Sequence, residues 1–309
     1  MRLITAATFG LFCLFGHARA AEIADRFPGA EWDHAMPAAA GWSADRLKAA
    51  EEWSGKIGST AIIVVHHGAI VGEWGNTSAK TPLASVRKSL LSALYGIAVE
   101  RGQINLNQNL AQLGIDDNEP SLSAEEKAAT VRDLLQARSG VYHAALYETP
   151  GMAARRPPRH SHPPGTFWYY NNWDFNTLGA IYEHVTKHSI FDAFDSEIAR
   201  PVGMQDYTPR DGAYVTGADS VYPAYPFEMS ARDLARFASC ICTTANGARR
   251  SLCQPPGSRR ARSRIRNRIS ARATATCGGP AFSRAPLRRA CMCRRARFSR
   301  GGPAVSSLS

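Results

Sequence analysis

The sequence predicts a protein that combines β-strands with several helices. Residues 60–74 (TAIIVVHHGAIVGEW) form two apolar runs around His66-His67-Gly68, the pattern of a β-hairpin whose histidines lie in the turn. Residues 85–100 (SVRKSLLSALYGIAVE) are strongly apolar and are closed by Arg101-Gly102, as in a buried helix. Helical spacing, cap residues or both predict further helices over 44–53, 130–136, 174–185 and 230–237.

The positive charge of the chain is confined to its last part. The 309 residues have a formal net charge of +11, but residues 240–309 contain 16 Arg and no Lys, Asp or Glu. Residues 1–239 carry 21 basic and 26 acidic side chains, a net charge of −5. A basic chain suggests a nucleic-acid partner, but an acidic body argues against one. We expect no nucleic-acid partner, and we expect residues 239–309 to be a disordered Arg-rich tail.

The first 20 residues have the features of a secretory signal peptide. Arg2 precedes an apolar run over 3–16, which is too short to span a membrane, and Ala18-Arg19-Ala20 is a small-x-small cleavage site. We expect cleavage between Ala20 and Ala21, and a periplasmic or secreted bacterial protein with no membrane span afterwards.

The cysteines agree with export and argue against a metal site. No Cys occurs from Ala21 to Ser239, as expected for an exported protein that needs no disulfides. The tail has six Cys but no His and no Cys-x-x-Cys pair, which are the usual features of zinc sites. We therefore expect neither a metal ion nor an organic cofactor.

Ser85-Val86-Arg87-Lys88, at the start of the apolar helix, is a candidate catalytic pair. Residues three apart share one helix face, so the Lys88 amine can reach the Ser85 hydroxyl. A serine hydroxyl needs a base to become a nucleophile, and burial can lower the pKa of a lysine enough for it to serve. The helix N-terminus favours a developing oxyanion. A capping serine followed by a surface lysine would have the same spacing.

Tyr170-Asn171-Asn172 is the second candidate element. A tyrosine can relay a proton between a nucleophile and a leaving group, and an asparagine can hold a substrate amide. The alternative is that this segment, with Phe167, Trp168 and Tyr169, is a buried aromatic cluster.

These segments together resemble the Ser-x-x-Lys serine hydrolases of the class C β-lactamase, DD-peptidase and esterase type. The resemblance runs in order through 84–89, 101–106, 130–135 with Ser139-Gly140, Tyr170-x-Asn172 with Leu178-Gly179, 201–204 and 231–234. It implies that Ser85 is acylated, that Lys88 and Tyr170 transfer protons, and that Asn172 contacts substrate. Arg87 occupies a variable position of the motif and is given no role.

The resemblance also implies a fold and a function. The expected fold is α+β and β-lactamase/transpeptidase-like: an antiparallel sheet flanked by helices, a helical lobe beside it, and the active site between them. The expected function is that of an exported monomeric serine hydrolase, which cleaves an amide or ester of a small-molecule or peptide-like substrate through an acyl-enzyme. The sequence leaves open a β-lactam, a peptidoglycan peptide, an ester or an oligoamide. The alternative is an inactive truncated product or a non-catalytic penicillin-recognition protein.

The C-terminal part departs from this family. Its third motif, Lys-Thr-Gly or His-x-Gly, is missing, as is the Trp-rich strand before it. Permitted codons for residues 270–279 (SARATATCGG), read two bases later, spell Gly-Pro-Gly-Tyr-Gly-Tyr-Leu-Trp-Trp, and the same offset over 238–247 and 303–309 permits other family-like sequences. We hypothesise that a frameshift near Ala238 left a hydrolase domain of residues 21–238 without its C-terminal strands. The nucleotide sequence of the gene tests this hypothesis.

Overall fold

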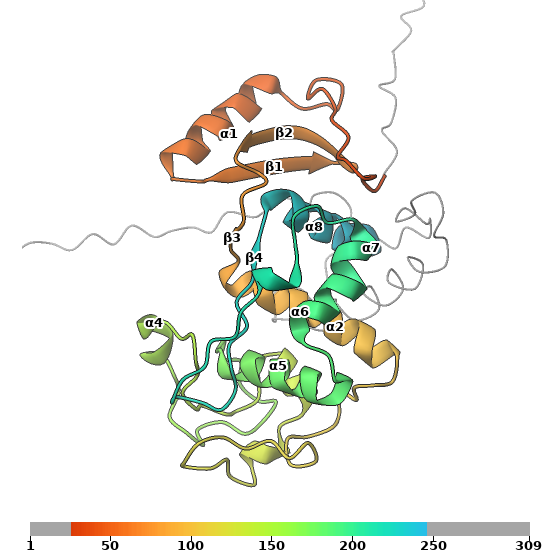
Figure 1. The fold of residues 1–309 in the computed structure, drawn as a ribbon. Helices are drawn as coiled ribbons and strands as arrows, with labels where there is room; N and C mark the ends of the chain where they lie inside the picture. The colour runs from red at the N-terminus through yellow and green to blue at the C-terminus, as the bar shows by residue number, and fades with distance from the viewer. Residues whose placement is uncertain (1–25, 246–309) are drawn as a thin grey trace, which may run out of the picture. The chain divides into compact units, whose positions relative to one another are not determined.

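The structure, a computed structural model, describes residues 26–245 (Figure 1). The predicted signal peptide and the Arg-rich segment beyond residue 245 lie outside these residues. The expectations of cleavage after Ala20 and of disorder beyond residue 245 therefore stay predictions.

The hairpin predicted at residues 60–74 is present. Strands β1 (Ala61–His66) and β2 (Ala69–Gly75) pair antiparallel. The turn residues His67 and Gly68 both have positive φ (48° and 80°), as in the turns that match the twist of two-residue hairpins. A Cβ on Gly68 would lie 1.8 Å from the carbonyl oxygen of Arg26, so this approach requires glycine.

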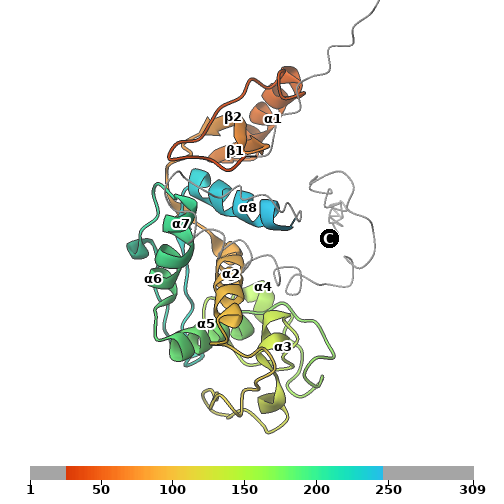
Figure 2. The same ribbon diagram turned by 90° about the vertical axis from the view of Figure 1, so that its right-hand side faces the viewer.

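One helix lies on each side of this hairpin (Figures 1 and 2). Helix α1 (Ala44–Lys56) is capped by the Ser43 side chain and is joined to β2 by a 2.8 Å hydrogen bond from Trp74 Nε1 to Ser54 Oγ. Helix α8 (Ala231–Ala245) contacts β1 from the other side. The hairpin and its two helices therefore form one layered part of the molecule.

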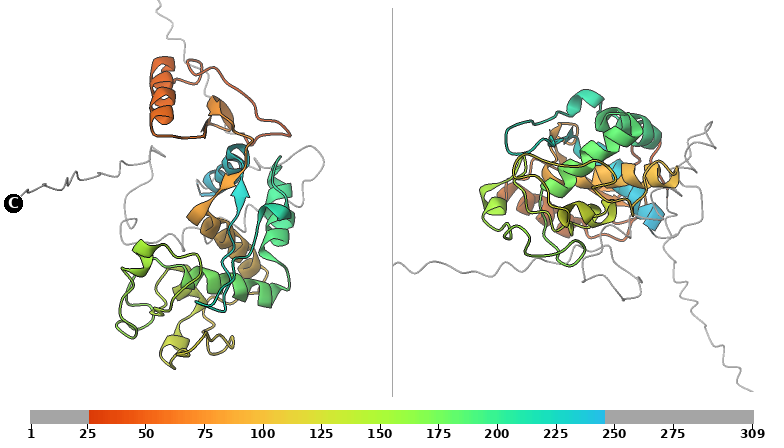
Figure 3. Two further views of the ribbon diagram at one scale, coloured as in Figure 1. Left: turned by 60° about the vertical axis from the view of Figure 1, so that its left-hand side comes forward. Right: turned by 90° about the horizontal axis from the view of Figure 1, so that it is seen from below.

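The apolar segment at 85–100 forms the buried centre of the second part. Its first residues make a 3₁₀ turn, η1 (Ala84–Val86), and the α-helix α2 (Arg87–Glu100) follows directly. The buried face of α2 includes Leu90, Leu91 and Leu94. Helices α5 (Trp173–Thr186) and α6 (Ile190–Phe194) pack against it, and the views of Figure 3 keep the three close together.

The remaining elements are short. They are β3 (Thr81–Pro82), η2 (Glu126–Ala128), α3 (Val131–Leu135), α4 (Pro150–Ala153), the π-helical turn η3 (Asp195–Ala199), α7 (Arg200–Val202), η4 (Pro209–Asp211) and β4 (Glu228–Met229). Thr130 caps α3 as predicted, in a capping box with Asp133. Strands β3 and β4 pair antiparallel, so residues just before Ser85 are held by residues almost 150 positions later.

Helix α8 is longer than predicted. The expected helix ended at Phe237, but the structure continues it to Ala245. Phe237 and Cys240 are 6% and 2% exposed, and Ile241 packs against the same core. This i, i+3, i+4 spacing places one apolar face toward the protein. The boundary proposed at residues 238/239 therefore falls within a helix.

Buried carboxylates hold the loops of the second part. Asp233 of α8 is fully buried and accepts hydrogen bonds from the backbone N–H groups of Gln205, Asp206 and Tyr207, at 2.6, 2.9 and 2.8 Å. Its carboxylate thus satisfies three donors of the loop that follows α7. An irregular loop can be buried only when its backbone donors are satisfied in this way.

Candidate active site

Ser85 and Lys88 lie next to each other at the start of α2. Lys88 Nζ is 3.2 Å from Ser85 Oγ, within hydrogen-bond distance. Ser85 is exposed, whereas Lys88 is only 7% exposed. The residue before them, Ala84, has a φ of 44°, a left-handed conformation that costs an L-residue about 1 kcal/mol or more. This residue lies between β3 and α2, directly before the serine.

Burial lowers the pKa of Lys88, although the contacts of its amine favour the charged form. Its Nζ donates to Asn172 Oδ1 at 2.8 Å and lies 4.7 and 5.2 Å from the ring centroids of Tyr170 and Phe175. Burial, and secondarily the positive charge of Arg87, lower the pKa of Lys88 from 10.5 to about 7. At neutral pH a large fraction of Lys88 is therefore unprotonated and able to accept a proton.

Asn172 and Tyr170 come from the segment that leads into α5. Asn172 is the N-cap residue of α5 and is 3% exposed; its Nδ2 donates to the backbone oxygen of Tyr147 at 2.5 Å. Its amide therefore ties Lys88 to the segment before α4. Tyr170 is 37% exposed and turns its ring face toward Lys88. The structure thus brings all four predicted residues together, while the substrate contact of Asn172 and the proton transfer by Tyr170 stay predictions.

The aromatic residues before Tyr170 are not a buried cluster. Phe167 and Trp168 are 41% and 52% exposed, which contradicts that alternative. Trp168 stacks on Tyr170 with ring centroids 6.5 Å apart, and Phe167 stacks on His162 at 4.0 Å. These rings give the exposed side of the site an aromatic surface.

The sequence analysis missed a buried hydrogen-bonded pair, Ser139 and Asp174, at the start of α5, although Ser139-Gly140 is part of the family resemblance. Ser139 Oγ donates to Asp174 Oδ1 at 2.5 Å, and burial raises the pKa of Asp174 to about 7. The neighbouring Gly140 has a φ of 73°, and a Cβ there would lie 2.5 Å from the backbone oxygen of His162. The Ser-Gly dipeptide therefore fastens its loop to the start of the helix that follows Asn172.

Arg87 was also missed, because it was assigned to a variable motif position. Its side chain is 1% exposed, and its guanidinium donates to Asn176 Oδ1 at 3.1 Å. The one sign in the sequence is its helical spacing from the buried residues of the same face, such as Leu90, Leu91 and Leu94. A charged residue is seldom expected on such a face.

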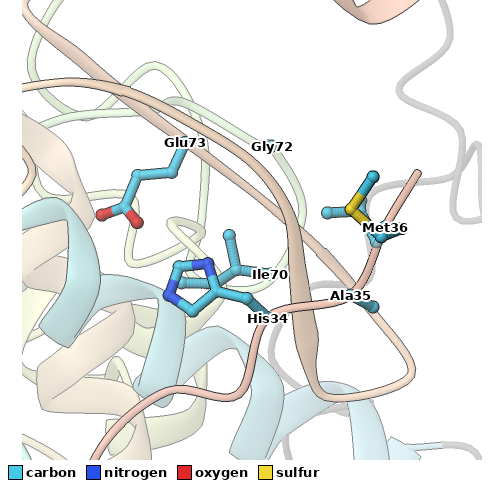
Figure 4. A pocket seen from close by; sticks show the side chains of 7 residues that line it. His34, Ala35, Met36, Ile70, Gly72 and Glu73 are labelled. Atoms are coloured by element: carbon cyan, nitrogen blue, oxygen red, sulfur yellow. The ribbon is translucent and has the colours of Figure 1, made fainter. Parts of the chain in front are cut away.

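Two hollows lie on the described surface. One of about 450 Å³ is beside β2 and is lined by residues 34–36 and 70–73, among them His34 and Glu73 (Figure 4). It contains none of the four predicted site residues. The other, of about 370 Å³, is lined by residues that include Tyr147, Glu148, Arg156 and Asp219. Because the Tyr147 backbone holds Asn172, this second hollow adjoins the site.

The described part of the chain was also searched for metal ligands and membrane spans. Over residues 26–245, His, Cys, Asp and Glu side chains form no group of three that could hold a metal ion. None of the helices in the same range has the length and apolarity needed to cross a bilayer.

Comparison with known proteins identifies the family. The sequence matches the model of the Beta-lactamase family over residues 39–286, which is more than half of the chain. The chain belongs to the Beta-lactamase family. The family predicted from the ordered segments around Ser85 and Tyr170 is thereby confirmed. No curated protein matches the sequence.

Solved structures similar to this Beta-lactamase family chain show its fold. A protein from Bacillus anthracis assigned as a 6-aminohexanoate-dimer hydrolase has a TM-score of 0.53 and 20% identity, over 75% of this chain and 68% of that one. A class C beta-lactamase has a TM-score of 0.51 and 17% identity, over 74% and 68%. SurE with D-Leu has a TM-score of 0.47 and 23% identity, over 72% of this chain. The chain spans 56% of the length of that SurE chain.

The expected β-lactamase/transpeptidase-like fold is therefore confirmed. In residues 26–245 its sheets are two small antiparallel pairs, β1–β2 and β3–β4, beside isolated β-bridges, and most of the described elements are helical.

Proposed function

We propose that this protein is a serine hydrolase that cleaves an amide or ester bond through an acyl-enzyme on Ser85. One observation carries the proposal: the exposed Ser85 hydroxyl lies 3.2 Å from the buried amine of Lys88. The lowered pKa of Lys88, about 7, suits a general base at neutral pH.

The proposed reaction follows from this pair. Neutral Lys88 takes the Ser85 proton as Oγ attacks the substrate carbonyl, and the new C–O bond gives a tetrahedral oxyanion. The positive end of α2, directed at Ser85, stabilises that charge. The C–N or C–O bond of the substrate then breaks, and the amine or alcohol leaves with the proton that Lys88 took. Water attacks the acyl-enzyme in the same way and restores Ser85.

Tyr170 and Asn172 have supporting roles in this proposal. Asn172 Oδ1 orients the Lys88 amine, and its Nδ2 is already bonded to Tyr147. The Tyr170 ring faces Lys88 at the exposed side, where a leaving group departs, so its hydroxyl is the candidate proton relay. Among the structural relatives with TM-scores above 0.5 are proteins described as a 6-aminohexanoate-dimer hydrolase and a class C beta-lactamase. The proposed substrate is an amide or ester of a small molecule or peptide: an oligoamide, a β-lactam, a peptidoglycan peptide or an ester.

Covalent labelling tests the proposal. The full chain is treated with a fluorescent organophosphonate and with a fluorescent penicillin, and the labelled residue is identified by mass spectrometry. We expect label on Ser85, none on the Ser85→Ala variant, and unchanged labelling of Ser89→Ala, which removes an exposed serine one turn along the same helix. Equal labelling of wild type and Ser85→Ala, or no labelling of a folded wild type, would contradict it.

The second candidate is a non-catalytic penicillin-recognition protein. It is favoured by the missing third motif, since loss of one oxyanion-hole donor alone costs roughly a hundredfold in rate. Reversible binding of a penicillin by a folded chain, with no Ser85 adduct, would support this candidate in place of the hydrolase.

We further propose that the protein is exported, on the evidence of its first 20 residues. Expression in a bacterium with a periplasm should give a periplasmic product that begins at Ala21. Changing both small residues of the cleavage site, Ala18→Asp with Ala20→Asp, should leave the leader attached. An intact N-terminus on wild-type protein in the cytoplasm would refute export.

A further inference from the structure

Arg87 is a buried charge that has no carboxylate partner among residues 26–245. Its side chain is 1% exposed, and the hydrogen bond that it makes goes to a neutral group, Asn176 Oδ1. Its Nη1 is buried and has no hydrogen-bond partner among the residues that the structure describes. A buried guanidinium is normally paired with an acid, because desolvation of an unpaired charge costs several kcal/mol. The cost of burying Arg87 indicates that its side chain has a function that offsets this cost.

The contacts of Arg87 join three separate segments to α2. Asn176 belongs to α5; Tyr225, whose ring lies 4.3 Å from Arg87 Cζ, precedes β4; and Tyr147, at 5.9 Å, precedes α4. The planar guanidinium stacks on aromatic faces in a way that an ammonium group does not. Asn176 also donates to the backbone oxygen of Leu146 at 3.1 Å, next to Tyr147.

These segments are the ones that hold Lys88. The Tyr147 backbone oxygen binds Asn172, and Asn172 binds Lys88 Nζ. Arg87 therefore contacts the Tyr147 segment that holds Asn172, and it directly precedes Lys88, the proposed base, in the chain. A shift of the Tyr147 segment would reach Lys88 through a single side chain, Asn172.

Arg87 is also the charged group that acts on Lys88. Two segments contribute groups that face the Lys88 amine. The Ser85 hydroxyl comes from η1, and the Asn172 amide and the rings of Tyr170 and Phe175 come from α5 and the residues before it. The titratable groups around Arg87 are Lys88 and the phenols of Tyr147 and Tyr225. Burial raises the pKa of Tyr225, so that its phenol is neutral at working pH and does not compensate the guanidinium.

We propose that Arg87 is a positioning residue of the site, which clamps the Tyr147 and Tyr225 segments onto α2 and keeps an uncompensated positive charge beside Lys88. This inference rests on the proposed function, because it assigns Arg87 to the base of that reaction. Arg87 would have two separable effects. The stacking of its planar guanidinium holds the two tyrosine segments in place, and its charge lowers the pH at which Lys88 loses its proton.

Two substitutions separate the effects. The rate constant for labelling by an organophosphonate is measured from pH 5 to 10 for wild type, Arg87→Met and Arg87→Lys. Arg46→Met, on the exposed face of α1, is the matched control. The wild-type rate should rise through about pH 7. Arg87→Met should move this midpoint upward, and each pH unit of movement lowers the rate on the acid side about tenfold. Its plateau at high pH should also fall.

Arg87→Lys keeps a charge but not the planar stacking. We expect its midpoint to stay near that of wild type while its plateau falls several-fold. Unchanged midpoint and plateau in folded Arg87→Met, or an unchanged plateau in Arg87→Lys, would overturn the proposal. If Arg87→Met does not fold, Arg87→Lys still tests the clamp.

A second measurement does not depend on activity. The Lys88 signal of ¹³C-lysine-labelled protein is titrated by NMR in the same variants, with Lys88→Met used for assignment. An upward shift of the Lys88 titration in Arg87→Met, but not in Arg46→Met, supports the charge effect even when the wild type is not labelled at all. A Lys88 titration that is the same in every variant overturns it. Failure of the proposed function and failure of this inference are thereby distinguished.

Discussion

Replacing Lys88 with methionine should slow the acylation of Ser85 by about a hundredfold to ten-thousandfold, because general-base catalysis of this kind contributes roughly 10²–10⁴ in rate and no second base lies within the contacts described for Ser85. The measurement is the rate of organophosphonate labelling at pH 8, with Lys48→Met, an exposed lysine of α1, as the control. Labelling of Lys88→Met within tenfold of wild type would remove Lys88 from the role of base.

The same substitution should make the folded protein more stable below pH 7. The pKa of Lys88 is about 7 in the folded chain and 10.5 as an ordinary lysine. Between these pH values the unfolded chain binds one proton more, so the free energy of unfolding rises with pH across the window. The penalty of the buried lysine is complete below pH 7, where it amounts to at most about 5 kcal/mol, and is absent above pH 10.5.

Urea unfolding at pH 6 and at pH 10.5 measures this effect. The gain in the free energy of unfolding of Lys88→Met over wild type should be several kcal/mol at pH 6 and near zero at pH 10.5, whereas Lys48→Met should show neither. A gain that is equal at the two pH values would mean that it comes from packing of the methionine and not from the buried charge.

Replacing Asp233 with alanine should destabilise the protein by about 4 kcal/mol or more. The substitution leaves the buried N–H groups of Gln205, Asp206 and Tyr207 without their acceptor, and each unsatisfied donor costs about 1–3 kcal/mol. Since domains are stable by only about 5–15 kcal/mol, a large fraction of the variant should be unfolded at 37 °C. Thermal unfolding followed by circular dichroism gives the loss.

Two controls sharpen this test. Asp45→Ala removes an acid from the exposed first turn of α1 and should change the stability little. Asp233→Asn keeps the shape but turns an NH₂ group toward backbone donors, so it should also destabilise. A melting temperature of Asp233→Ala within 2 °C of wild type would show that the loop finds other acceptors.

The elements that the sequence predicted well are those with a local cause. The hairpin follows from two apolar runs around His67 and Gly68, and the start of α3 follows from Thr130 and Asp133, three residues apart. The end of α8 was placed too early because the sequence around Cys240 is rich in small residues. Its helical face becomes recognisable only when the core against which Cys240 packs is known.

The site divides in the same way. Ser85 and Lys88 could be proposed because their spacing on a helix is local, and Tyr170 and Asn172 could be proposed from their side-chain chemistry together with a family resemblance. The bond between Arg87 and Asn176, and that between Ser139 and Asp174, join residues far apart in the chain. No spacing in the sequence marks such pairs, since the first depends on how helix α2 packs on α5 and the second on how the loop after α3 reaches the start of α5.

The pairing of β3 with β4 has a consequence for when the proposed nucleophile, Ser85, reaches its final geometry during synthesis. Leu83, two residues before Ser85, donates its backbone N–H to the Phe227 oxygen at 2.9 Å, and Thr81 is paired with Met229. A ribosome that has made Ser85, Lys88 and Asn172 has therefore not yet made the strand that fixes the approach to Ser85. The geometry around Ser85 is completed only after residue 229 has left the exit tunnel, so on the proposed function Ser85 is not yet a nucleophile for most of the translation of the chain.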